Sequence, residues 1–97
     1  MNIIENQITA AINDEMANAV SVFGLHNSAH EKYAVCNEEY DEAYDEIQKC
    51  VRCMNTIWEL TKNNENTTSM YQSLADAAKN LAIEACQLAA VANKSIK

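Results

Sequence analysis

Three glutamates, Glu39, Glu42 and Glu46, recur at spacings of three and four residues inside a stretch that has the apolar periodicity of one long helix. A helix advances about 100° per residue, so the three side chains share one edge of it. That edge is predicted to be neither core nor an ordinary solvated face. The apolar residues on the same edge are Val35, Cys53, Ile57 and Leu60.

A carboxylate beside apolar surface must be protonated, paired with a base or bound to a metal, because burying an unpaired charge is costly. Glu84 interrupts the apolar stripe of a later helical stretch in the same way. If the two stretches form an antiparallel hairpin that turns near Asn64, residues 42 and 84 are each about twenty residues from the turn and lie at similar heights. Glu39, Glu42, Glu46 and Glu84 are therefore predicted to converge.

Several carboxylates in close quarters cannot all stay ionised without a cation. Mg²⁺ and Mn²⁺ prefer ligation by oxygen atoms alone, so the functional interpretation is a divalent metal site. Glu15, which interrupts the first helical stretch, is a secondary candidate as a further ligand or a cross-subunit partner. The structural alternative is that the glutamates reach solvent beside the core, or pair with Lys49, Lys79 or Arg52 of a neighbouring subunit.

The composition predicts a single all-α domain over residues 1–97. One Gly, no Pro and 48% hydrophobic residues leave few turn signals and no expected strands. A net charge of −7 with a single Arg disfavours nucleic acid and anionic membranes as partners. No stretch is apolar enough to span a bilayer and no secretory pattern is present, so a cytoplasmic protein with reduced cysteines is expected.

Three long helices, possibly with short extra turns, are expected in an antiparallel bundle. The first runs from Asn2 to Phe23 and stops at Gly24. A capping box at Ser28–Glu31 starts the second, which continues to about Thr61. A second box, Ser69–Gln72, starts the third, which runs to near the C-terminus.

The apolar stripe of the second helix is expected to lie in the core or in an interface. The third helix is apolar nearly all round, which implies burial from two directions. We therefore predict a homodimer or homotetramer in which the third helix is central; the alternative is a hairpin that folds back on itself. The stripe of the second helix consists of Tyr33, Cys36, Tyr40, Ala43, Tyr44, Ile47, Val51, Met54 and Trp58.

Two acidic segments carry a family resemblance. The run from His30 to Ala43 resembles the EExxE helix of MazG-like nucleoside triphosphate pyrophosphohydrolases, in particular the small phage and prophage type. The run from Glu84 to Ala92 resembles their second acidic helix. The resemblance implies an all-α homo-oligomer that uses Mg²⁺ or Mn²⁺ to cleave a (d)NTP to the (d)NMP and pyrophosphate.

The family pattern is ExxE followed by ExxD, which assigns catalytic and metal-binding roles to Glu39 and Glu42. Glu84 then begins the second metal-binding pair, and Gln87 stands where that pair has Asp. Glu46 is an additional candidate ligand from periodicity. The neutral amide of Gln87 is a weaker metal ligand than a carboxylate.

Two further departures from the family bear on whether the chain is an enzyme. The segment between the acidic motifs is longer than is typical, and few Lys or Arg residues lie near the motifs to hold a triphosphate. The alternative function is a non-catalytic phage or prophage module for helical oligomerisation or protein interaction that keeps the MazG-like fold. A third hypothesis is a small regulator whose acidic surface binds a basic host or phage protein.

Overall fold

The computed structural model describes residues 2–23 and 28–96. Within these ranges the chain forms three helices, α1 (Asn2–Phe23), α2 (Ala29–Lys62) and α3 (Thr68–Ser95), and no strand. The prediction of an all-α fold with three long helices is therefore confirmed. The predicted stop at Gly24 lies outside the described residues.

The helix starts show one prediction confirmed and one wrong. The Ser28 side chain accepts a hydrogen bond from the Glu31 backbone N–H at 3.1 Å, as the first capping box predicts. α3, in contrast, begins at Thr68, before the Ser69 box. The Asn66 side-chain oxygen accepts the Thr68 N–H at 2.8 Å, so an amide in the loop satisfies the free donor of the first turn. In the same loop Asn64 has φ 56°, a left-handed conformation that Asn tolerates well.

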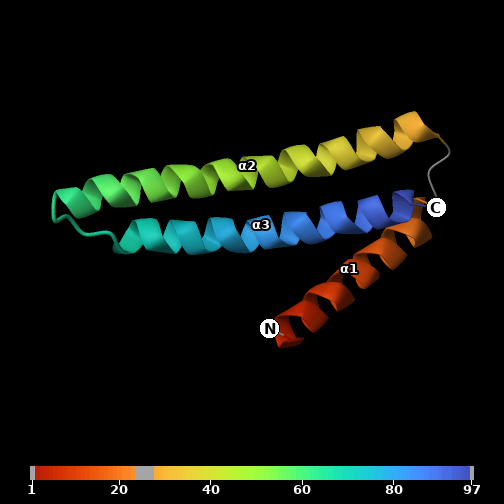
Figure 1. Cartoon of the computed structure of the whole chain (residues 1–97), viewed down its shortest axis with the longest axis horizontal. Helices are drawn as coiled ribbons and strands as arrows, with labels where there is room; N and C mark the ends of the chain where they lie inside the picture. Colours follow the sequence, from red (N-terminus) through yellow and green to blue (C-terminus); the bar gives the residue numbers. More distant parts are fainter. Residues whose placement is uncertain (1, 24–27, 97) are drawn as a thin grey trace.

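The helix arrangement is a long hairpin with a third helix laid against one side (Figure 1). α2 and α3 run antiparallel along most of their length, whereas α1 packs on α3 and diverges from it toward the N-terminus. α3 therefore has two neighbours within its own chain. This explains why α3 is apolar on two sides without a second subunit, so the expectation that α3 is the centre of an oligomer loses its main support. Whether the chain associates stays a prediction.

The core is thin and made of small side chains. Of the described residues, none with a large side chain is fully buried. The α2 edge that carries the glutamates includes two buried residues, Cys53 and Ile57, so this edge faces α3. The prediction that the edge is not core is wrong at these two positions, whereas Glu39 and Glu46 are half-buried. Cys53 on this edge and Ala43, the smallest member of the neighbouring stripe, let the two helices approach closely, which the bulky members of that stripe would prevent. The buried apolar residues are Ala43, Cys53, Ile57, Ala77, Ala90 and Val91.

The molecule is elongated, with principal extents of 55 × 31 × 19 Å. Its radius of gyration is 17.0 Å, against about 12–13 Å for a compact domain of this length. The cysteines are free thiols, and Cys53 is buried among apolar residues as expected. No helix in the described part of the chain is long and apolar enough to cross a membrane.

Candidate metal centre

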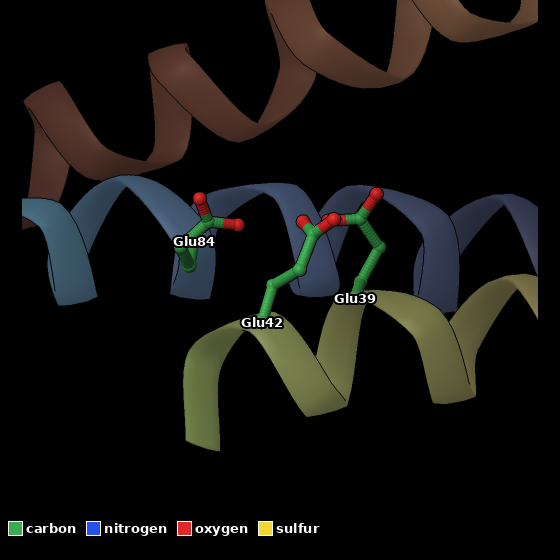
Figure 2. A group of neighbouring side chains, drawn as sticks. All are labelled: Glu39, Glu42 and Glu84. Carbon is green, nitrogen blue, oxygen red and sulfur yellow. The ribbon is translucent and has the colours of Figure 1, made fainter. Parts of the chain in front are cut away.

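Three carboxylates from two helices form what we call the acidic centre: Glu39 and Glu42 on α2, and Glu84 on α3. One oxygen from each lies within 4.8 Å of the others. Figure 2 shows the carboxylates of Glu39 and Glu42 side by side, with Glu84 approaching from the neighbouring helix. The hairpin register that brings them together also sets Cys36 Sγ 3.7 Å from Ser95 Oγ. The prediction that positions 42 and 84 reach similar heights is confirmed.

Burial leaves two oxygens of this centre without partners. Glu39 and Glu84 are half-buried, and Oε2 of each is buried with no hydrogen-bond partner among the described residues. A buried acceptor left unpaired costs about 1–3 kcal/mol, and more when it is charged. Glu42 is exposed and closes the group on its solvent side. The centre thus presents acceptors that a cation would satisfy.

The pKa values of Glu39 and Glu84 are also consistent with a site that a cation would stabilise. Burial, followed by the nearby carboxylates of Glu42 and Glu84, raises the pKa of Glu39 to about 7. Burial, and then Glu42, also raises the pKa of Glu84. At neutral pH this centre therefore resists full ionisation, because burial and the neighbouring carboxylates both disfavour the charged forms.

The spacing of the oxygens fits a hard divalent cation. Mg²⁺ binds oxygen at about 2.0–2.1 Å and Ca²⁺ at about 2.3–2.6 Å, so ligands on opposite sides of either ion lie about 4–5 Å apart. The 4.8 Å limit on the separation of the three oxygens falls in this range. Three carboxylates also supply the all-oxygen, anionic donor set that Mg²⁺ and Mn²⁺ prefer.

The structure places Glu46 and Gln87 beside the acidic centre. Glu46 Oε1 accepts a hydrogen bond from Lys49 Nζ at 2.9 Å, so part of this carboxylate is already paired within α2. Its Oε2 is buried and has no partner in the described part of the chain, and its charge contributes to the raised pKa of Glu84. Gln87 is half-buried one turn along α3 from Glu84.

A cavity of about 610 Å³, the central cavity, opens beside Glu39 between the three helices. Its size is within the range of small-molecule sites. Gln87 and Lys94 line it from α3, and Glu15 and Asn18 line it from α1. Glu15, the secondary candidate, therefore lies on the wall of the cavity next to Glu39 and outside the group of three carboxylates.

Lys94 is the residue that sequence reasoning missed. Its side chain is only 5% exposed and lines the central cavity, and within the described ranges it has no ion pair or hydrogen bond. Lys94 stands seven residues after Gln87 and so lies on the same face of α3. This spacing is the feature of the sequence that could have identified Lys94 as a site residue. The structure therefore adds one lysine to the few basic residues expected near the acidic motifs.

The raised pKa of Glu39 predicts how stability depends on pH. The folded protein holds a proton on Glu39 up to about pH 7, whereas the unfolded chain loses it near 4.5. The folded state therefore binds more protons between these values, and the free energy of unfolding falls as pH rises through this window. In a chelating buffer we expect the melting temperature to be about 5–10 °C lower at about pH 8 than at about pH 5.

Glu39→Gln should flatten this pH dependence, because the amide does not titrate. Millimolar Mn²⁺ at about pH 8 should raise the melting temperature of the wild type and leave that of Glu39→Gln unchanged. Thermal melts followed by circular dichroism measure both effects. A metal-induced rise of equal size in the two proteins would place the ion elsewhere.

Comparison of the chain with protein-family models, curated proteins and solved structures finds no match. The chemistry of the site therefore has to be argued from its own geometry. Three features of the site bear on that chemistry: converging carboxylates, buried oxygens without partners, and a lysine that lines the same cavity of ligand size as Glu39.

Proposed function

We propose that this protein is a Mg²⁺-dependent nucleoside triphosphate pyrophosphohydrolase of the MazG-like kind. The observation that carries the proposal is the convergence of Glu39, Glu42 and Glu84, two of them with buried unpartnered oxygens. The resemblance of the two acidic segments to that family supports the reaction class. The central cavity, with its buried lysine, supplies a place for the rest of the substrate.

The three carboxylates would hold the metal ion, with Glu46 and Gln87 next to them. When bound, Mg²⁺ would neutralise phosphate charge and lower the pKa of a coordinated water. Gln87 is neutral, so the centre carries three charged ligands, which suit one divalent ion better than two. Mn²⁺ has the same preference for oxygen and should substitute.

Lys94 would bind the phosphate oxygens of the nucleotide through its ammonium group. Lys94 has no ion pair within the described ranges, so its ammonium is available to pair with an anionic substrate in the central cavity. Water then attacks the α-phosphorus, the bond from the α-phosphorus to its bridging oxygen breaks, and the nucleoside monophosphate and pyrophosphate leave. Positioning and charge stabilisation supply most of the catalysis in such a reaction.

The test is release of pyrophosphate from a panel of ribo- and deoxyribonucleoside triphosphates. We expect release from at least one nucleotide with Mg²⁺ or Mn²⁺, none in a chelating buffer, and equimolar monophosphate as the second product. Release of inorganic phosphate instead would show a different bond being cleaved. No release from any nucleotide would contradict the proposal and favour the non-catalytic oligomerisation module.

One observation favours that second candidate independently of the acidic centre. A row of bulky apolar side chains along α2 is exposed, and a module for oligomerisation needs such a surface. A homo-oligomer is part of both proposals, so association alone does not separate them.

A further inference from the structure

The exposed row on α2, here called the α2 row, is a regular apolar stripe. Its positions recur every three or four residues, and all are apolar or aromatic except Asn37, which lies between Tyr33 and Tyr40. The two end residues, Tyr33 and Trp58, are 72% and 59% exposed. None of its members is charged. The apolar members are Tyr33, Tyr40, Tyr44, Ile47, Val51, Met54 and Trp58.

A second row, the α3 row, follows the same spacing along α3. It is composed of small side chains between one aromatic and one branched residue at its ends. All of its members are exposed or half-buried. They are Tyr71, Ala75, Ala78, Ala82, Ala85, Ala89, Ala92 and Ile96.

Both rows lie on one side of the hairpin. Each apolar member of the α2 row follows by one residue a member of the edge that faces α3, as Tyr44 follows Ala43 and Met54 follows Cys53. In the same way, each member of the α3 row comes one residue after a residue of α3 that faces α2, as Ala78 comes after Ala77. One residue turns each helix about 100° in the same sense. Because α2 and α3 are antiparallel, equal turns bring the two rows to the same side, which we call the hairpin face.

The hairpin face lies opposite α1 and the acidic centre. α1 covers the other side of α3, where Cys86 and Gln87 line a cavity with Asp14 of α1. No described helix covers the hairpin face itself. A partner on this face would therefore leave the acidic centre open.

The area is that of an interface. At about 200 Å² for a whole aromatic side chain, the four aromatic residues of the α2 row expose roughly 450 Å². The aliphatic members of the α2 row and the members of the α3 row add to this exposed area. The total exceeds the largest apolar patch of most soluble monomers, which is about 300–600 Å². A standard stable interface needs about 800 Å² from each partner.

We infer that a second copy of this chain covers the hairpin face, with α2 of each copy packed on α3 of the other. The face is self-complementary: one row is bulky and the other is made of alanines that leave room for bulky side chains. A twofold axis parallel to the helices places the bulky row on the small row in both halves at once. The product is a closed four-helix bundle.

The register of the hairpin identifies the contacts. Cys36 lies opposite Ser95, and Glu42 lies near Glu84, so Tyr44 stands level with Ala85 of its own chain. A twofold axis along the bundle keeps that level and brings Tyr44 onto Ala85 of the partner subunit. Neither row holds a charged residue, so the association buries no unpaired charge. With a net charge of −7, an anionic lipid surface is a poor alternative occupant.

Sedimentation equilibrium tests the inference. We expect the wild type to have the mass of two chains at micromolar concentration. Val51→Asp in the α2 row should weaken association by at least about a hundredfold, as expected for a charge in the centre of an interface. Thr56→Asp is the matched control, because Thr56 is also β-branched and exposed on α2 but lies on the side away from the hairpin face.

A size swap tests which helix meets which. Tyr44→Ala and Ala85→Tyr should each weaken the dimer, and the double variant should restore it, because the pair exchanges places across the interface. Circular dichroism checks that each variant keeps its helices. A monomeric wild type at about 100 μM, or an intact Val51→Asp dimer, would overturn the interface. An unrestored double variant would overturn the pairing of α2 with α3. None of these measurements depends on pyrophosphate release, so the proposed function and the dimer fail separately.

Discussion

Glu42→Gln is expected to lower the rate of pyrophosphate release by roughly a thousandfold. The substitution removes one of the three charges in the acidic centre and keeps the shape of the side chain. Glu42 is the exposed member of the three, so the helices should remain intact and the melting temperature should change little. Steady-state kinetics with saturating Mg²⁺ and nucleotide measures the loss.

Asp41→Asn is the matched control, since Asp41 is the adjacent carboxylate on α2 and is also exposed. It is not a member of the acidic centre, and its rate should equal that of the wild type. Equal losses in the two variants would indicate a general effect of charge on this surface. A wild-type rate in Glu42→Gln would remove Glu42 from the reaction.

Lys94→Met should raise KM for the nucleotide by about 10–100-fold, the cost of losing a hydrogen bond to a charged group. Met matches the length of the Lys stem, so no cavity forms. In the substrate-free protein the change breaks no ion pair of the described structure and places an apolar side chain at a position that is only 5% exposed. The melting temperature should therefore be equal to or higher than that of the wild type.

Opposite movements of stability and substrate binding separate a binding role from a structural one. If Lys94 serves only the packing of α3, Lys94→Met should lower the melting temperature and leave KM unchanged. Lys94→Arg keeps the charge and should retain part of the affinity. Initial rates over a range of nucleotide concentrations, with thermal melts on the same samples, give both quantities.

The helices and the convergence of Glu42 with Glu84 follow from local signals. Periodicity and the Ser28 cap act within a few residues of sequence, so they survive whatever the rest of the chain does. The pairing of positions 42 and 84 needs only a short turn and equal helical rise on either side of it. α3 starts before the Ser69 box because the Asn66 side chain satisfies the Thr68 N–H, a donor one residue before that box.

The choice of the α2 edge that faces α3 was not predictable in the same way. Two apolar stripes lie one residue apart on α2, and the one with Tyr44 is the bulkier and more apolar. The structure places the edge with Cys53 and Ile57 against α3, because close helix packing depends on side-chain size across the contact. Lys94 was missed for a related reason: its burial depends on where α1 packs, and a single helix pattern does not contain that information.

The small core has a consequence for the abundance of the protein. The six buried apolar side chains of the described residues, three of them alanine, give one chain little free energy with which to offset the entropy of ordering long helices. Covering the hairpin face with a second copy would make folding and association one equilibrium, governed by mass action. Dilution would then act as a denaturant, and a cell that makes little of this protein would hold a smaller folded fraction of it.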